Sequence, residues 1–305
     1  MLKEILITIA AILICTLAQA QTTLAEYHFE TEDVQEVTVR AIFCDVNVVQ
    51  GDKLIFDGII TGSGNEGDYL ISSMQSGKTV VFKVEKDKKS KWGWDNIKKA
   101  QINLTLPAGV NLTIDNTSGD IEVNRLEGDA HSIGTTSGDM YLRNVTGDLS
   151  GGSTSGDIDI DGLLGMISIR STSGDQQYEN VDGDISAKAT SGDIELQTVT
   201  GQVDMETTSG GIELDGVFGA LKLRTTSGDI NGSDVRLSAD SKARTTSGEI
   251  ELEFINDINE MSFDLDASSG DLTVGRRSGS DRLEITRGGI LFVGRSTSGD
   301  QSYTN

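Results

Sequence analysis

The sequence is poor in cysteine, proline, histidine and aromatic residues. Its 305 residues include two cysteines, one proline and two histidines, and aromatic residues make up 5% of the chain. Cys15 lies in an N-terminal apolar stretch that we expect to be removed, so Cys44 has no partner for an intramolecular disulfide. The folded chain must therefore be stabilised by its core and by its backbone hydrogen bonds.

The scarcity of histidine and aromatic residues also limits the chemistry. His28 and His131 are the only histidines and lie far apart in the sequence, which argues against a histidine metal site or a Ser-His-Asp relay. Few aromatic rings are available as platforms for sugars. A glycosidase, however, needs only a pair of carboxylates, and carboxylates are frequent here. We expect no enzyme and no cofactor, with a polysaccharide lyase or hydrolase as the alternative.

Positive charge is scarce as well. The chain has 48 acidic and 25 basic residues and a formal net charge of -23. Such a charge repels the phosphates of nucleic acids and disfavours broad contact with anionic lipid. We therefore expect no nucleic-acid partner.

The N-terminus resembles a secretory signal peptide. Lys3 precedes an apolar run from Ile5 to Ala18, and Ala18-Gln19-Ala20 has the small-residue pattern of a cleavage site, which predicts cleavage before Gln21. The run is too short to span a bilayer comfortably, and no later apolar stretch is long enough for a transmembrane helix. We expect an exported protein that is periplasmic, surface-bound or secreted.

One short phrase, Thr-Ser-Gly-Asp, returns along the second part of the chain. From Gly138 to Gly228 each repeat glycine follows the last by eighteen residues. Periods of this size over many copies are typical of a solenoid. The phrase and its close variants occupy Thr117–Asp120, Thr136–Asp139, Thr154–Asp157, Thr172–Asp175, Thr190–Asp193, Thr208–Gly211, Thr226–Asp229, Thr246–Glu249, Ser268–Asp271 and Thr297–Asp300.

Each eighteen-residue unit divides into two halves. Thr190–Thr198 and Val199–Thr207 both have glycine third and apolar residues fifth and seventh. About four residues of turn and five of alternating strand fit each nine-residue half. Two halves return the chain to its start one strand spacing, about 4.8 Å, higher. The sequence predicts an all-β β-solenoid with an interior of Ile, Leu, Val and Met.

The chain divides into three parts on this pattern. We expect a signal peptide at 1–20, an irregular β part with the first coils or a cap at 21–110, and regular repeats at 111–305. Cys44-Asp45-Val46 is a degenerate copy of the repeat with Cys44 in the glycine position. The glycine spacing lengthens after Gly228, which predicts outward loops near 231–234 and 256–260.

The junction of the last two parts carries a family resemblance. Ile102–Glu122 reads INLTLPAGVNLTIDNTSGDIE and is followed by serial Thr-Ser-Gly-Asp-Ile repeats. This arrangement resembles the bacterial putative adhesin family of β-strand-repeat proteins, related to the head-domain putative autotransporter adhesins. The resemblance covers nearly all of the mature chain and implies a right-handed β-helix-like fold at the envelope or surface. It supplies no catalytic residues, and the chain departs from it by lacking a visible anchor.

Two repeated columns have competing interpretations. Asp139, Asp157, Asp175 and Asp193 would bind calcium if they resembled nonapeptide toxin repeats, but the second glycine of those repeats is missing. The other interpretation is that each Asp bonds a turn amide, and we expect no metal. The adjacent Thr and Ser columns, such as Thr154, are either an ice- or sugar-binding face or turn hydroxyls bonded to the next coil.

One loop breaks the repeat and is the candidate partner contact. Its residues combine positive charge with the only two tryptophans of the chain, a pairing common at interfaces. The alternative is a solvated loop whose tryptophans pack on the edge of the coil. The candidate contact residues are Lys88, Lys89, Lys91, Trp92 and Trp94. The sequence thus predicts a non-enzymatic surface or periplasmic binding or structural module, whose partner is a cell-envelope glycan or a protein.

Overall fold

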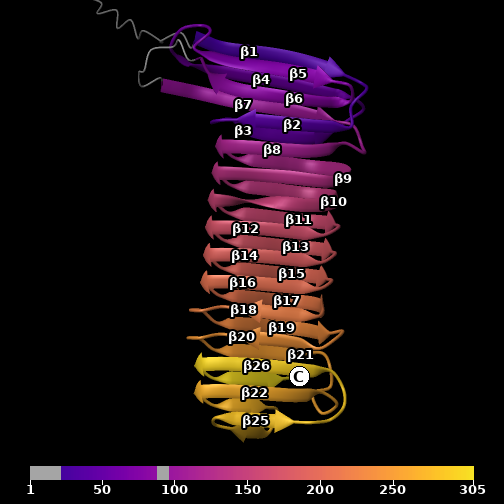
Figure 1. The fold of residues 1–305 in the computed structure, drawn as a ribbon, viewed down its shortest axis with the longest axis vertical. Coiled ribbons are helices and arrows are strands. Elements are labelled where there is room, and N and C mark those ends of the chain that lie inside the picture. Colours follow the sequence, from indigo (N-terminus) through magenta and orange to yellow (C-terminus); the bar gives the residue numbers. More distant parts are fainter. Residues whose placement is uncertain (1–21, 88–95) are drawn as a thin grey trace, which may run out of the picture.

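The computed structural model describes residues 22–87 and 96–305. These residues form one sheet of 27 strands, without a helix, wound into a long column (Figure 1). The predicted β-solenoid is confirmed. No helix in the described ranges is long and apolar enough to cross a membrane. The predicted signal peptide lies outside these residues.

The strands fall into three groups. The first group is β1 (Thr22–Thr31), β2 (Glu36–Ala41), β3 (Asp45–Gln50), β4 (Leu54–Ser63), β5 (Tyr69–Ser76), β6 (Thr79–Lys86) and β7 (Asn96–Leu106). The regular stack is β8 (Asn111–Ser118), β9 (Ile121–Ser137), β10 (Met140–Ser155), β11 (Ile158–Leu164), β12 (Ile167–Ser173), β13 (Gln176–Asp182), β14 (Ile185–Ser191), β15 (Ile194–Thr200), β16 (Val203–Ser209), β17 (Ile212–Gly219), β18 (Leu221–Arg224), β19 (Ile230–Leu237), β20 (Ser241–Arg244) and β21 (Ile250–Phe254). The last group is β22 (Ser262–Ser269), β23 (Leu272–Val274), β24 (Arg277–Gly279), β25 (Arg282–Ile285), β26 (Leu291–Ser298) and β27 (Gln301–Thr304).

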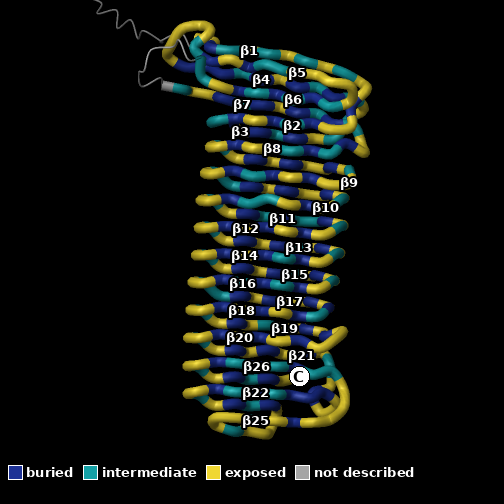
Figure 2. Tube along the Cα trace, viewed as in Figure 1, coloured by how far each residue is buried: buried dark blue, intermediate teal, exposed yellow. Residues whose placement is uncertain are grey.

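In the regular stack each strand pairs in parallel with the strand one coil away. β15 lies between β13 and β17, and Ile194 stands opposite Ile212. From β11 to β18 the register is the same in every coil, so equivalent residues form continuous columns. Ile194 and Leu196 are fully buried, whereas Glu195 between them is exposed. Figure 2 shows this alternation along the whole column.

Two coils carry a polar network inside the core. Gln176 occupies an Ile position, and its side-chain oxygen accepts a hydrogen bond from Tyr178 Oη at 2.6 Å while its nitrogen donates to Ser171 Oγ at 2.7 Å. Gln301, Tyr303 and Ser296 repeat the network near the C-terminus. Both copies come from the phrase Ser-Thr-Ser-Gly-Asp-Gln-x-Tyr. The buried hydroxyls are satisfied, so the tyrosines add apolar area without an unpaired polar group.

The coils at both ends are stacked out of sequence order. β2 lies between β6 and β8, and β3 lies between β7 and β9. At the other end β26 lies between β20 and β22 (Figure 1), and β27 lies between β21 and β23. Each terminal coil is therefore held by parallel pairing on both sides.

Antiparallel strands cover the outer coils. β4 pairs with β7 and β5 with β6 at one end, and β25 pairs with β22 and β24 with β23 at the other. β24 and β25 are only three and four residues long and begin with Arg277 and Arg282. Short, charged edge strands discourage pairing with other chains, and Arg277 and Arg282 supply positive charge at this edge.

The degenerate copy at Cys44 is a true coil position. A Cβ on Gly119 would meet the carbonyl of Cys44, as one on Gly138 would meet that of Gly119. Cys44 thus occupies the glycine position, as the sequence predicts. Burial raises the pKa of its thiol to about 12, so the thiol stays protonated. The division of the chain at residue 110 remains a prediction.

One predicted loop is wrong. β17 and β19 keep the eighteen-residue offset as far as Leu237, which stands opposite Gly219, whereas Lys242 stands opposite Lys222. The two extra residues therefore lie at 238–240 and not at 231–234. The predicted loop at 256–260 lies between β21 and β22. This connection spans the coil of β26 and β27, which is inserted between the coils of β21 and β22.

The alternation predicts a large difference between neighbouring substitutions. Ile194→Asp places an unpaired charge in the core and should lower the free energy of unfolding by more than about 3 kcal/mol. Glu195→Lys should change it by less than about 0.5 kcal/mol, because the side chain faces water. Urea denaturation of both variants measures the difference. Equal effects would contradict the observed register.

Candidate functional site

The two broad faces of the column carry opposite charge. The first, the acidic face, is formed by β11, β13, β15, β17, β19 and β21. Its two outward columns begin at Asp159 and Asp161 and contain no lysine or arginine as far as β21. They carry the carboxylates of Asp159, Asp161, Glu179, Glu195, Glu213, Asp215, Glu251 and Glu253.

The second, the basic face, is formed by β12, β14, β16, β18 and β20. Its two outward columns begin at Ser168 and Arg170 and hold more basic than acidic residues. The acidic residues are Asp204 and Glu206. The basic residues are Arg170, Lys188, Lys222, Arg224, Lys242 and Arg244.

Only part of this positive charge is neutralised. Lys188 Nζ lies 2.8 Å from a carboxylate oxygen of Glu206, and Lys222 Nζ lies 2.6 Å from one of Asp204. Arg224 also contacts Glu206, at 3.6 Å. The remaining three cations are exposed, and no carboxylate of residues 22–87 or 96–305 forms an ion pair with them. These are Arg170, Lys242 and Arg244.

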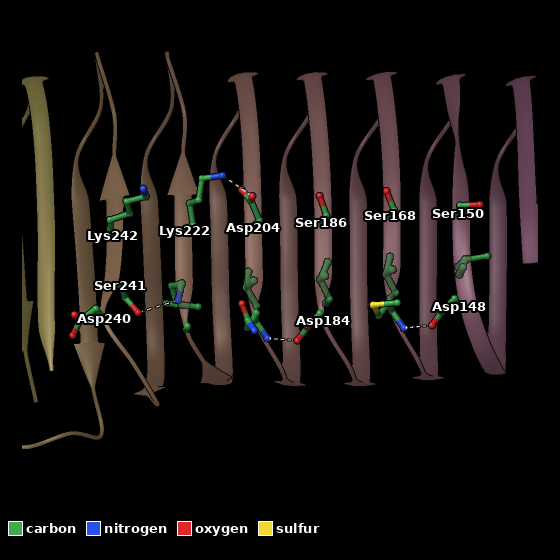
Figure 3. A pocket seen from close by; sticks show the side chains of 18 of the residues that line it. Asp148, Ser150, Ser168, Asp184, Ser186, Asp204, Lys222, Asp240, Ser241 and Lys242 are labelled. Atoms are coloured by element: carbon green, nitrogen blue, oxygen red, sulfur yellow. Dashed lines mark hydrogen bonds and ion pairs between the residues drawn. The ribbon is translucent and has the colours of Figure 1, made fainter. Parts of the chain in front are cut away.

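A groove of about 790 Å³ runs along the basic face, across the strands from β9 to β26. Figure 3 shows Ser150, Ser168 and Ser186 in one row, followed by Asp204 and the two lysines of the same column. The small serine side chains leave space between two rows of longer residues. On one side is the row of turn residues Asp148, Met166, Asp184, Gln202, Ala220 and Asp240. The next outward row on the other side begins at Arg170 and borders a separate hollow, which Arg170, Lys188 and Glu206 line.

The turn side of the groove is fixed by hydrogen bonds between coils. Asp148 Oδ1 accepts from the backbone N–H of Met166 at 3.0 Å, and Asp184 Oδ1 accepts from that of Gln202 at 2.8 Å (Figure 3). Ser241 Oγ accepts from the N–H of Leu221 at 2.9 Å. These contacts hold the groove in one shape before any ligand binds.

Sequence reasoning missed the basic face and its groove. The lysines and arginines are visible in the repeat, since Lys188 follows Arg170 by eighteen residues. The overall charge of -23 hides their common position in the half-repeat. Sorting charged residues by repeat position would have found the basic face.

The aspartate column is a hydrogen-bond ladder. Asp139 Oδ1 accepts from the backbone N–H of Asp157 at 2.9 Å, and Asp157 and Asp175 do the same for the next coil at 2.9 and 2.8 Å. The turn-amide interpretation is thus confirmed. Across 22–87 and 96–305, no group of three or more His, Cys, Asp or Glu residues is arranged to hold a metal ion.

The exposed threonines of the repeat do not form the hydrogen bonds to the next coil that one interpretation of the sequence predicts. Thr154, Thr172 and Thr190 are exposed, and within the described parts no hydrogen bond joins their hydroxyls to the next coil. The threonine before the phrase has that role instead: Thr225 Oγ1 donates to the carbonyl of Gly210 at 2.9 Å. Its side chain points inward at the corner, where a backbone carbonyl is within reach.

The predicted partner loop cannot be placed against the groove. Lys88, Lys89, Lys91, Trp92 and Trp94 lie outside the described residues, and their role remains a prediction.

The two histidines belong to different parts of the fold. His28 in β1 contacts Asp57 at 2.6 Å on the exposed N-terminal end, whereas His131 in β9 is buried. His131 Nδ1 accepts from the N–H of Leu112, and Nε2 donates to the carbonyl of Thr146. Burial lowers the pKa of His131, so the ring is neutral and has a packing role.

The fold defines the class of protein first: a β-solenoid of parallel coils with a preformed groove along one face. The model of the Toastrack DUF4097 family matches residues 34–202 and 197–288. These segments make up more than half of the chain, so the chain belongs to the Toastrack DUF4097 family. The family resemblance predicted from the sequence is confirmed.

Three solved structures are similar to the chain at low sequence identity. A putative lipid binding protein from Parabacteroides distasonis is 12% identical, with 90% of this chain and 96% of that chain covered and a TM-score of 0.38. A putative adhesin from Bacteroides fragilis is 12% identical, with 92% and 97% covered and a TM-score of 0.31. A putative cell adhesion protein from Clostridium sporogenes is 11% identical, with 93% and 100% covered and a TM-score of 0.23. No curated protein matches the chain.

The aspartate ladder predicts a small, metal-independent contribution to stability. Asp175→Ala removes one acceptor and should lower the free energy of unfolding by about 1 kcal/mol, whereas Asp175→Asn keeps an oxygen at the same place and should lower it less. Calcium should not raise the melting temperature beyond a sodium control of equal ionic strength. A rise specific to calcium and reversed by a chelator would contradict the ladder.

His131 predicts a pH dependence of stability. Its folded pKa lies below the unfolded value of about 6.5, so the unfolded state takes up a proton first as the pH falls. Below about pH 6.5 the free energy of unfolding should therefore fall, by at most about 1.4 kcal/mol per pH unit from this group. Urea titrations against a His131→Gln variant isolate the effect. Parallel pH profiles for the two proteins would refute it.

Proposed function

We propose that the chain is an exported, non-enzymatic β-solenoid that acts as an adhesin-like binding module at the cell surface or in the periplasm. The observation that carries the proposal is the groove on the basic face, which runs along many coils of one sheet. A groove that crosses hydrogen-bonded strands keeps its shape, so a ligand binds without the cost of ordering a loop. Its length suits an extended partner.

The composition of the groove favours binding over catalysis. In three successive coils the same side chain recurs, as Ser150, Ser168 and Ser186, whereas a catalytic pair is a single arrangement. Repeated equivalent positions suit a polymer, because each coil offers the next unit of the chain the same contacts. The pattern of residues 1–20 supports export.

The proposal predicts that filling the groove abolishes binding. Ser168→Trp places a large ring in the groove without changing the charge, and should reduce binding of the chain from Gln21 to isolated envelope material by tenfold or more. Gln177→Trp is the matched control, because Gln177 is exposed on the acidic face one half-coil away. Cosedimentation measures binding, and thermal melting checks that both variants are folded.

Two results would contradict this function. Equal binding by the two tryptophan variants would place the contact outside the groove. Conversion of envelope polysaccharide to shorter chains by the wild-type protein, lost in Ser168→Trp, would show that the groove is the cleft of a lyase or hydrolase.

A further inference from the structure

We propose that the groove holds a linear anionic polysaccharide, which lies along the stack and is bound through its acidic groups at two separate points. This inference rests on the proposed binding function and specifies the class of ligand. It follows from the shape of the groove, the position of the unpaired cations and the polar groups between them.

The shape favours a linear chain. The groove runs perpendicular to the strands, so it advances by one strand spacing, about 4.8 Å, per coil. A sugar unit of an extended polysaccharide is about as long as one such step. Successive sugars would therefore meet equivalent positions on successive coils, such as Ser150, Ser168 and Ser186.

The unpaired cations divide into two points along the basic face. Lys242, which lines the groove, forms one point with Arg244, and Arg170 forms the other. The two arginines stand beside the groove, in the next outward row. The register Arg170, Lys188, Glu206, Arg224, Arg244 places them four coils apart, which is about 19 Å at the usual strand spacing. The arginines can each hold a carboxylate or sulfate in a bidentate contact.

Between these points the groove offers hydrogen-bonding groups rather than free charge. The cations there are paired with Asp204 and Glu206, and the floor carries serine hydroxyls. Such groups suit the hydroxyls of sugars. The ligand that fits is therefore a polymer whose negative charges are separated by hydroxyl-rich units.

Denser polyanions fit less well. Asp148, Asp184 and Asp240 stand along the turn side of the groove and repel a closely charged chain such as polyphosphate or nucleic acid. Among the residues that the structure describes, no Phe, Tyr or Trp lines the groove for stacking of bases. The acidic face of a second copy would complement the basic face, but two chains of net charge -23 repel each other.

The two-point arrangement makes binding depend on ligand length. Hyaluronan oligosaccharides are suitable probes, because units that carry a carboxylate alternate with neutral units rich in hydroxyls. An oligomer of about five units spans both points, whereas the dimer reaches only one. Isothermal titration should show the pentamer binding at least tenfold more tightly than the dimer. A neutral gluco-oligosaccharide of equal length should bind at least tenfold more weakly than the pentamer.

A charge variant tests the assignment of the cations. The triple variant Arg170→Ser, Lys242→Ser and Arg244→Ser should bind the pentamer at least tenfold more weakly and lose the length dependence. The matched control removes three exposed arginines elsewhere: Arg143→Ser, Arg236→Ser and Arg276→Ser. It changes the net charge equally and should retain the length dependence. High salt should weaken wild-type binding strongly.

Each contrary outcome has a distinct meaning. If pentamer and dimer bind equally, or the neutral oligomer binds as well as the acidic one, the inference is wrong, while envelope binding that Ser168→Trp blocks would leave the proposed function standing. Equal envelope binding by the Ser168→Trp and Gln177→Trp variants would contradict both this inference and the proposed function. Self-association of the wild type without glycan, abolished by the triple variant, would identify the acidic face of a second copy as the occupant and overturn the glycan.

Discussion

The stack depends on how closely the corners of successive coils approach one another. At each Thr-Ser-Gly-Asp corner the glycine has a positive φ, +136° at Gly192, and a Cβ there would collide with the carbonyl of Gly174 one coil away. Any other residue would both strain the backbone and push the coils apart. The following Asp then accepts the turn amide of the next coil. One four-residue corner therefore sets the coil spacing, and both the core and the surface columns follow from it.

The surface columns can vary because they do not set this spacing. Two neighbouring carboxylates about 4.8 Å apart repel by about 0.9 kcal/mol in water before salt screening, and the acidic face accepts this repulsion over several coils. On the basic face, Asp204 and Glu206 pair with the cations in the middle, and unpaired cations lie at the two ends. The fold requires neither the carboxylate columns of the acidic face nor the cations of the basic face. Their separation onto two faces is therefore the surface feature that the repeat itself does not explain.

The sequence repeat predicts most features that depend on a single coil. It identified the inward Ile194 and Leu196, the bonded aspartates and the coil position of Cys44, because each depends on residues within one coil. The out-of-order coils could not be predicted, since coils with the same alternation and length fit any neighbour. The groove was also missed, because it depends on the size of side chains on coils eighteen residues apart rather than on any motif.

The ends of the column protect the groove, because a long groove keeps its shape only if its coils keep their spacing. In a solenoid stacked in chain order the last coil would pair on one side and fray first. Here β26 and β27 are held on both sides, and so are β2 and β3. Fraying must then begin in the antiparallel strands outside them. The strand that carries Arg244 pairs directly with β26, and the strand that carries Arg170 lies four coils further in, so the two points of positive charge keep a constant separation.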